Sequence, residues 1–339
     1  MSYYKNRLFF ERNENLNTTP RTFPAKIRQL EALESRLPTA HKIFPTIVTE
    51  AKRARAGWRG EISMDYYYRQ LDLPRQHYFV HQLRLPRNMD FFQMDTLLLT
   101  KYFFLILEIK NLAGTLTFDH EHQQLLRTHG DQQEVFADPV LQAEQQAALL
   151  KTWLQAHFGS SPPIYAYAVM TNNNSILKNA TPHALHHQII RPPALRPILQ
   201  DLFVKERCHA LEHEVNVYVK ALRKAHRPAR YCAMEKYELS RVDLKNGVFC
   251  PGCSGVMKWR HGKWMCPRCG TLSRDAHHKA LHDYALLISP YISTGECQAY
   301  LQLPEINTAQ RILKKLNLTH SGGTKARKYH LRDDLIKAK

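Results

Sequence analysis

Short apolar runs separated by polar residues dominate the middle of the chain. Residues 97–99 are leucines, residues 102–107 are apolar or aromatic throughout, and the polar pair Thr100 and Lys101 lies between the two runs. Both runs are too short for helices, and short apolar runs with polar boundaries are typical of buried strands. We therefore predict a buried β-hairpin within residues 93–111 that turns near Lys101.

Helical and strand-like patterns alternate on either side of this hairpin. A first helix from Pro24 buries one face, and a second follows a break near Pro45 and continues through residue 71. Further on, a helix beginning near Pro139 and a helical stretch leading away from the core are predicted. The predicted strands lie at 78–85, 115–118, 123–128, 164–170 and 188–190. The two later helices are predicted at 141–158 and 198–226.

Two carboxylates and a lysine converge at one end of the predicted hairpin. Its antiparallel register sets Asp95 opposite Leu107 or Glu108, and opposed side chains lie about 5 Å apart. Glu108 and Lys110 share one face of their strand because side chains alternate, whereas Ile109 points to the other face. Mg²⁺ commonly takes one or two carboxylates and several waters, so this set is chemically sufficient for it. Taken alone, the three residues are better explained as ordinary polar strand ends.

The order and spacing of the trio match a known catalytic motif. Asp95, twelve residues and then Glu108-Ile-Lys110 resemble the catalytic core of PD-(D/E)xK nucleases, and the chain resembles more narrowly the nuclease-related domain (NERD) family. The resemblance covers roughly residues 50–200. It rests on Gly57-Trp-Arg-Gly60-Glu61, Met94-Asp95, Glu108-Ile-Lys110-Asn111 with Gly114, and Asp138-Pro139-Val-Leu-Gln142. The chain departs from the family in having Gln93 before Met94 and no glycine in the turn between Asp95 and Glu108.

This resemblance implies a restriction-endonuclease-like α/β core, in which helices flank a mixed central sheet. Asp95, Glu108 and the Ile109 carbonyl would hold Mg²⁺ or Mn²⁺, which lowers the pKa of an attacking water. Lys110 would position that water or stabilise charge on the pentavalent phosphate.

Two further residues enter the site by resemblance. Glu61 would bind the metal directly or through water, although it could simply favour its helix or pair with Arg59. Gln142, in the first turn of the helix after Pro139, would orient a phosphate or water. It could equally cap that helix or decorate the surface.

Four cysteines form the most specific pattern in the chain. Cys250-Pro-Gly-Cys253 is followed after twelve residues by Cys266-Pro-Arg-Cys269. Each C-x-x-C turn, or knuckle, presents two thiolates, and two knuckles complete the tetrahedral coordination of a structural Zn²⁺ ion. The doubled motif argues against a redox-active cysteine pair. A small hairpin turning at His261-Gly262 would make the segment a zinc ribbon, which resembles the C4 zinc fingers appended to bacterial type I topoisomerases.

The predicted ribbon carries a basic surface. Trp259 and Trp264 alternate with the cations, so the surface suits nucleic acid, although the tryptophans could instead form the small core of the ribbon. The cations that we expect to contact DNA are Lys258, Arg260, Lys263 and Arg268.

The C-terminal segment has the order helix, turn, helix and basic hairpin. It resembles winged helix-turn-helix modules, in which the helix at 308–316 would enter the major groove and the hairpin would contact the backbone. Asn307 or Thr308 would cap that helix. The cations expected to contact DNA here are Arg311, Lys314, Lys315, Lys325, Arg327 and Lys328.

The overall charge indicates a polyanionic partner. The 339 residues carry a formal net charge of +18, with a pI near 9.6. Nucleic acid, most plausibly DNA, suits this excess better than a membrane, because no basic amphipathic helix and no apolar run of membrane-spanning length occurs. The absence of an apolar signal segment and the metal-binding use of cysteine favour a cytoplasmic protein.

We therefore expect a metal-dependent DNA nuclease, an endodeoxyribonuclease hydrolysing phosphodiester bonds. The alternative is a non-catalytic DNA-binding or regulatory protein that uses a nuclease-like fold. The oligomeric state is left open, with a homodimer as one option. The expected division is an N-terminal arm and helix (1–45), nuclease domain (46–200), helical linker (201–245), C4 zinc ribbon (246–273) and winged-helix domain (274–339).

Overall fold

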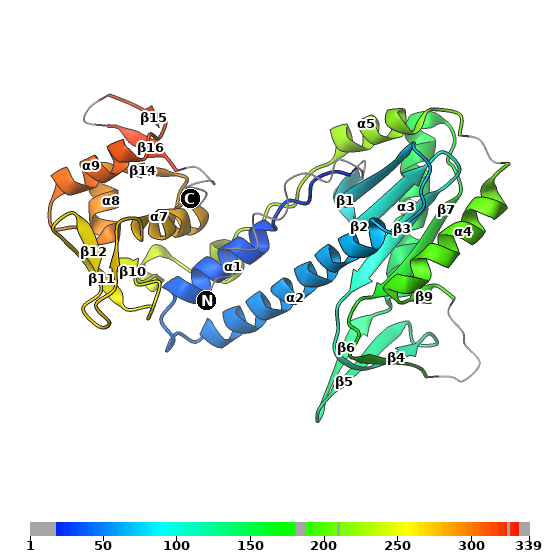
Figure 1. Ribbon diagram of the computed structural model, residues 1–339, viewed down its shortest axis with the longest axis horizontal. Helices are drawn as coiled ribbons and strands as arrows, with labels where there is room; N and C mark the ends of the chain where they lie inside the picture. The colour runs from blue at the N-terminus through cyan, green and yellow to red at the C-terminus, as the bar shows by residue number, and fades with distance from the viewer. Residues whose placement is uncertain (1–17, 181–186, 209–210, 324–325, 332–339) are drawn as a thin grey trace. The chain divides into compact units, whose positions relative to one another are not determined.

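The computed structural model describes residues 18–180, 187–208, 211–323 and 326–331 (Figure 1). The chain forms two compact units, and each unit is made of two separate segments of the sequence. Unit 1 comprises Met1–Thr22 and Arg55–Arg230, and unit 2 comprises Phe23–Ala54 and Tyr231–Lys339. This division differs from the five consecutive segments expected from the sequence, because the first helix and the C-terminal third belong to the same unit.

A five-stranded mixed sheet forms the centre of unit 1. Its strand order is β1-β2-β3-β7-β9, in which β1, β2 and β3 are antiparallel and β7 and β9 continue in parallel with β3. Residues 104–109 of β3 are apolar except for Glu108 and are all buried, as expected of a central strand that is covered on both faces. The five strands are β1 (His77–Arg87), β2 (Asp90–Thr100), β3 (Phe104–Lys110), β7 (Ile164–Met170) and β9 (Ile189–Ile190).

Helices cover both faces of this sheet, which confirms the expected α/β core. One face packs against α3 (Pro139–Phe158) and α5 (Val215–Ala225). The other packs against α4 (Leu195–Glu206) and the C-terminal half of α2 (Phe44–Tyr68). The segment expected as a helical linker thus includes α5, whose buried Val215, Tyr218, Val219 and Leu222 complete the core.

A second, four-stranded sheet follows β3 in the chain. Its order is β6-β5-β4-β8, and β8 runs parallel to β4. The strands are β4 (Gly114–Asp119), β5 (Gln124–His129), β6 (Gln132–Ala137) and β8 (Ser175–Asn179). The hairpin of β4 and β5 was predicted. The edge strands β6 and β8 were not, because both are short and largely polar, and such sequences carry little strand signal.

The first helix of the chain is part of unit 2. Helix α1 (Ala25–Arg36) packs against α7 (His277–Leu287), with the N-terminal half of α2 and α6 (Ala233–Lys236) completing a small core. Arg36 is 1% exposed, and its Nε donates a 2.9 Å hydrogen bond to Asp283 Oδ2. Its Nη1 donates to the Gly247 carbonyl at 2.6 Å. A buried, hydrogen-bonded ion pair therefore joins residues that are far apart in sequence.

The cysteine-rich segment forms a four-stranded antiparallel ribbon with strands in chain order. The predicted hairpin is confirmed, with β11 (Val256–Arg260) and β12 (Lys263–Met265) turning at His261 and Gly262. The outer strands are β10 (Val248–Phe249) and β13 (Leu272–Ser273). The ribbon shares one continuous apolar core with the segment that follows it, so the two are not separate folding modules.

That following segment consists of α7, a strand, two helices and a hairpin. A three-stranded sheet of order β14-β16-β15 joins the strand before the helices to the hairpin after them. Glu305 is the N-terminal cap residue of α9, in place of the predicted Asn307 or Thr308. The elements are β14 (Tyr291–Ser293), α8 (Thr294–Leu301), α9 (Ile306–Lys315), β15 (His320–Ser321) and β16 (Lys328–His330). Among the described helices, none has the length and apolar character that a membrane span needs.

Candidate functional site

The turn between β2 and β3 sets the register of the candidate site. Thr100 and Phe103 close the turn through a backbone hydrogen bond of 3.1 Å, next to the predicted Lys101. Thr96 pairs with Leu107, so one further step in the same register sets Asp95 opposite Glu108. The backbone N–H of Ile109 donates to Asp95 Oδ2 at 2.9 Å. The hairpin thus fixes Asp95 directly beside the Glu108-Ile109-Lys110 segment.

Both carboxylate oxygens of Glu108 are hydrogen-bonded. Lys110 Nζ lies 2.7 Å from Oε1, which confirms that the two side chains share one face of β3. Gln146 Nε2, from α3, donates to Oε2 at 2.8 Å. The carboxylate is therefore held from the strand on one side and from the helix on the other.

Asp95 lies in a strongly acidic environment. Burial raises the pKa of Asp95 well above its usual value, and the negative charges of Glu108 and Glu61 raise it further. The hydrogen bond from Ile109 and the charge of Lys110 oppose only part of this rise. Three carboxylates on two strands and a helix therefore act on one another, and a cation among them would relieve the repulsion.

Glu61 joins this cluster from helix α2. Its Oε2 accepts a 3.1 Å hydrogen bond from Gln82 Nε2 and lies 3.6 Å from Arg21 Nη1. These partners differ from the Arg59 pairing considered as the alternative. Burial raises the pKa of Glu61, and the Arg21 guanidinium opposes that rise. Gln82 has a φ of 52°, a left-handed conformation that is uncommon outside glycine and occurs on β1 opposite Asp95.

Gly60 allows α2 to approach the end of β3 closely. A Cβ atom on Gly60 would lie 2.6 Å from Cβ of Asn111, which no structure tolerates without a shift. Asn111 Nδ2 also donates to the Ala56 carbonyl at 2.7 Å. The glycine and the asparagine of the sequence motifs therefore form one helix-to-strand contact, which brings Glu61 beside the carboxylates of the hairpin.

Helix α3 begins as the sequence predicts, but a different glutamine reaches the carboxylates. Asp138 caps the helix by accepting from the N–H of Val140 at 2.7 Å, with Pro139 in the first turn. Gln142 Oε1 is buried and has no hydrogen-bond partner among the described residues. The contact to Glu108 comes from Gln146, one turn further along the same helix face.

Four residues near the carboxylates were not predicted from the sequence. Gln146 follows Gln142 at a spacing of four, and Asp65 follows Glu61 at the same spacing, so helical periodicity is the signal that points to both. Arg21 lies outside every motif, and its Nε and Nη2 both lie 3.2 Å from Asp65 Oδ1. Gln82 lies within an ordinary strand pattern. For Arg21 and Gln82 no local sequence signal exists.

The carboxylate cluster fits a hard divalent cation. Asp95 and Glu108 offer two oxygen ligands, and the Ile109 carbonyl and waters would complete an oxygen set of the kind Mg²⁺ and Mn²⁺ prefer. The convergence of these carboxylates is the observation that supports this fit, because a cation among them would stabilise their ionised forms. Lys110 already lies against Glu108 and would share that carboxylate with the ion.

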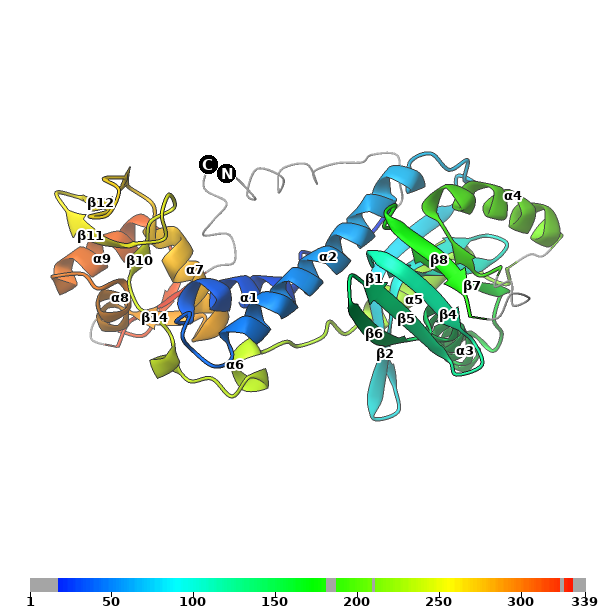
Figure 2. The ribbon, with the colours of Figure 1, turned by 90° about the horizontal axis from the view of Figure 1, so that it is seen from below.

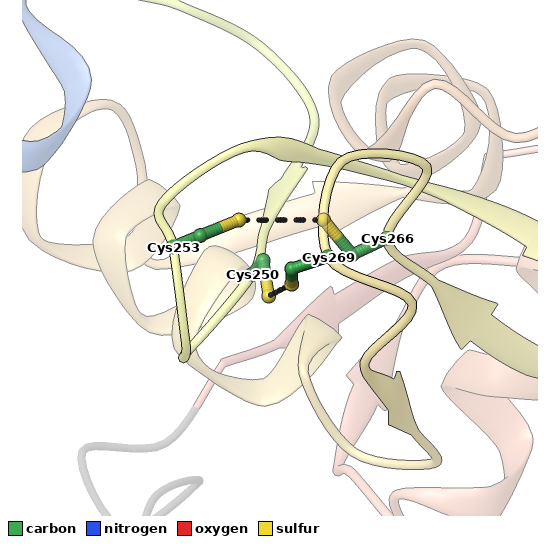
Figure 3. Close-up of side chains that lie close together, drawn as sticks. All are labelled: Cys250, Cys253, Cys266 and Cys269. Atoms are coloured by element: carbon green, nitrogen blue, oxygen red, sulfur yellow. Dashed lines mark hydrogen bonds between the residues drawn. The ribbon is translucent and has the colours of Figure 1, made fainter.

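The four cysteines form a much tighter set (Figure 3). Their sulfur atoms all lie within 4.8 Å of one another, with Cys250 3.6 Å from Cys269 and Cys253 3.5 Å from Cys266. Tetrahedral Zn²⁺ with Zn–S bonds of about 2.3 Å sets sulfurs about 3.8 Å apart, so the spacing suits this ion. Within the described part of the chain, this is the group of His, Cys, Asp and Glu side chains already close enough to hold one ion.

The two cysteine knuckles have the same backbone pattern. Ser254 N–H donates to the Cys250 carbonyl, and Gly270 N–H donates to the Cys266 carbonyl, both at 2.9 Å. Ser254 and Gly270 also both adopt positive φ, at 58° and 72°. Each knuckle is therefore one tight turn that presents two sulfurs, and the pair closes around a single point.

The basic residues of unit 2 are mainly at the surface. Trp264 is 0% exposed, and its Nε1 donates to His277 Nδ1 at 3.0 Å, so this tryptophan is core and cannot stack on a base. Lys263 and Arg327 are half-buried, and Lys325 lies outside the described residues. Of the cations expected to contact DNA, the exposed ones are Lys258, Arg260, Arg268, Arg311, Lys314, Lys315 and Lys328.

Unit 1 is thus a mixed α/β domain in which helices flank a central sheet, with an aspartate and an E-x-K sequence on paired strands of that sheet. Residues 56–171 match the family model of the nuclease-related domain, NERD, so the chain contains this domain. The matched segment includes Glu61, Asp95, Glu108, Lys110 and Gln142, but not Arg21. Searches of curated proteins and of solved structures found no match to the chain.

Proposed function

We propose that the protein is a metal-dependent DNA nuclease that hydrolyses phosphodiester bonds. The observation that carries this proposal is the convergence of Asp95, Glu108 and Lys110, with Asp95 held by the Ile109 N–H at 2.9 Å. Burying an aspartate beside two other carboxylates costs stability, because like charges repel one another. A purely structural role for these residues would not explain that cost. Functional sites are where such costs are commonly found.

The residues of the cluster would divide the chemistry among them. A Mg²⁺ or Mn²⁺ ion bound by Asp95, Glu108 and the Ile109 carbonyl would activate water and neutralise phosphate charge. Lys110, anchored on Glu108, would orient the attacking water or donate to the phosphate oxygens. Gln146 would hold the Glu108 carboxylate in place. Glu61 and Gln142 would complete the site, with Gln142 Oε1 as a buried acceptor for a water.

DNA is the proposed substrate, and unit 2 would supply part of its binding. The net charge of +18 supports a polyanion. The order of helix, strand, two helices and hairpin in α7 to β16 supports a winged helix, with α9 in the major groove and the β15–β16 hairpin on the backbone. Structural Zn²⁺ on the four cysteines would hold the ribbon. Reduced, metal-binding thiols support a cytoplasmic location.

Cleavage of plasmid and single-stranded DNA tests the proposal. We expect cleavage with Mg²⁺ or Mn²⁺, none in EDTA, and none from Lys110→Ala protein purified in the same way. An endonuclease would convert supercoiled plasmid to open circles and linear DNA. Binding without cleavage under all metal conditions would contradict the proposal and favour a non-catalytic DNA-binding protein.

A further inference from the structure

The β1–β2 hairpin extends beyond the rest of the sheet (Figure 2). Apolar side chains at its end are exposed. Met89, at the turn, is 100% exposed, and Phe91 is 38% exposed. Arg87 and Asn88 beside them are also exposed. Met89 is therefore left uncovered by the described residues, and it lies beside the partly exposed Phe91.

The basic segment that ends α5 is fixed to this hairpin. Arg227 N–H donates to the Arg84 carbonyl at 3.0 Å, and Arg84 N–H donates to His226 Nδ1 at 3.1 Å. The guanidinium of Arg84 lies 3.7 Å from the ring centre of Phe91 and donates to the Arg227 carbonyl at 3.2 Å. The hairpin end and the α5 terminus therefore form one surface, which we call the hairpin surface.

This surface concentrates positive charge. None of its five cations forms an ion pair with a carboxylate of the described residues, and Asp90, which is paired with Arg87 across the hairpin, accepts a hydrogen bond from the Phe91 N–H. Cations in the last turn of a helix interact favourably with the helix dipole. This interaction explains the positions of Arg223 and Lys224 but not those of the other cations. Gathering like charges costs free energy that a polyanion would offset. The five are Arg84, Arg87, Arg223, Lys224 and Arg227.

We propose that the hairpin surface binds duplex DNA, with the Met89 tip in the major groove and the surrounding cations on the phosphates. A two-stranded β-ribbon fits the B-DNA major groove, which is about 12 Å wide, and apolar side chains can contact the thymine methyl groups exposed there. The major groove of A-form RNA is too deep and narrow for the same fit. The inference rests on the proposed function for its substrate class.

The position of the surface relative to the carboxylates suits a nuclease. Met89 lies six residues before Asp95 on the same hairpin, which is roughly 20 Å along a strand. This distance corresponds to about six base pairs at 3.4 Å each. The hairpin surface would therefore hold the flank of a duplex whose backbone reaches the cluster at Asp95 and Glu108.

Equilibrium binding of a fluorescent 30-base-pair duplex in EDTA tests the inference without cleavage. For the full chain carrying Arg87→Ala and Lys224→Ala, we expect roughly tenfold weaker binding at 0.1 M salt. The slope of log affinity against log salt should become shallower by about 2, since each lost phosphate contact removes about 0.9. Thermal unfolding of each variant would confirm that the fold is intact.

The matched control is Lys151→Ala with Arg207→Ala, which also removes two exposed cations from unit 1. Lys151 lies beside Ile164, and Arg207 follows the Phe203 that packs on Phe103, so both lie toward the other end of the sheet. We expect this control to bind as the unaltered protein does. Equal affinity and slope in the test and control variants would overturn the inference.

Two further measurements test the groove contact. Met89→Asp should weaken duplex binding severalfold, whereas Met89→Leu should preserve it. If Met89→Asp had no effect, or if duplex RNA competed for binding as well as duplex DNA, the tip would not enter the major groove. Either result would overturn this part of the inference. A protein that binds through the hairpin surface but cleaves nothing would contradict the proposed function alone.

Discussion

Gln146 Nε2 lies 2.8 Å from Glu108 Oε2, on the side of the carboxylate opposite Lys110. The amide therefore limits the orientations that Glu108 can adopt. We expect Gln146→Ala to lower cleavage about 10- to 100-fold and to raise the Mn²⁺ concentration needed for half-maximal activity, as is typical when a group that holds a metal ligand is lost. Gln145→Ala, at an exposed neighbouring position of α3, is the control. Equal losses in both variants would refute the role of Gln146.

Replacing Asp95 should raise the stability of the fold while it abolishes cleavage. Its raised pKa means that ionised Asp95 destabilises the folded state, and this cost grows as the pH rises through the folded-state pKa. Asp95→Asn should therefore raise the Tm of EDTA-treated protein at pH 8 by a few degrees, with a smaller gain at pH 5, while cleavage disappears. Calorimetry at the two pH values measures the first effect. A lower Tm at pH 8 would show that the carboxylate stabilises the fold.

Arg21 stabilises the ionised forms of two carboxylates of α2, so the effect of replacing Arg21 on folding stability should depend on pH. The pKa of both Glu61 and Asp65 is raised, burial being the main cause, and Arg21 opposes the rise in each. Without Arg21, ionised Glu61 and Asp65 would cost more, and this extra cost is absent where both are protonated. We expect Arg21→Met to lower the free energy of unfolding by about 2 kcal/mol at pH 8 and by less at pH 5.

Urea denaturation at the two pH values measures this difference. Lys26→Ala serves as the control, because Lys26 pairs with Glu50 at 3.2 Å and both side chains are partly exposed to solvent. Exposed pairs contribute about 1 kcal/mol or less. An Arg21→Met effect that is the same at pH 5 and pH 8 would argue against the electrostatic role.

The cysteine quartet should hold one zinc ion per chain. Cys250→Ser should reduce the bound zinc to near zero in metal analysis, because a structural site needs all four ligands. It should also alter the fluorescence of Trp259 and Trp264, whose rings are 5.1 Å apart beside the knuckles. Cys208→Ser, which lies outside the quartet and is exposed, should change neither property. Full zinc content in the Cys250→Ser protein would contradict the assignment.

The Arg36–Asp283 ion pair makes unit 2 depend on both of its segments. Asp283→Ala leaves the buried Arg36 guanidinium without its carboxylate, and such a loss typically costs about 3–5 kcal/mol. We expect unit 2 to unfold at a lower temperature while metal-dependent cleavage of DNA at high protein concentration persists. A tail truncated near Lys245 would remove the same partner and expose the apolar face of α1, so the point substitution is the cleaner test. Unchanged unfolding would show that the ion pair contributes little.

Local sequence patterns were sufficient wherever one short segment determines the geometry. The apolar runs around Thr100 predicted the hairpin and left two registers open, with Asp95 opposite Leu107 or Glu108. The observed register sets Asp95 opposite Glu108. The paired C-x-x-C knuckles predicted a cluster that the structure contains. In both cases strand alternation or a tight turn fixes the side chains without help from distant residues.

Contacts between distant segments were not predictable in this way. Arg21 reaches Glu61 and Asp65 only because residues 18–19 lie along β1, where Thr19 N–H donates to the Phe79 carbonyl at 2.9 Å. Gln146 rather than Gln142 meets Glu108 because the docking of α3 on the sheet decides which turn is closest. The left-handed backbone of Gln82 has no signature in its sequence, since glycine or asparagine would be expected there.

The two-segment composition of unit 2 has a consequence for the order of events during synthesis. Residues 23–54 leave the ribosome early, but their packing partners in 231–339 are made only after residues 55–230. At about 5–20 residues per second, that interval lasts roughly 10–35 s. The nuclease-related domain can therefore complete its sheet while α1 is still without α7. A newly made chain would complete the sheet of unit 1 before the core of unit 2, and the apolar face of α1 would stay uncovered for this interval.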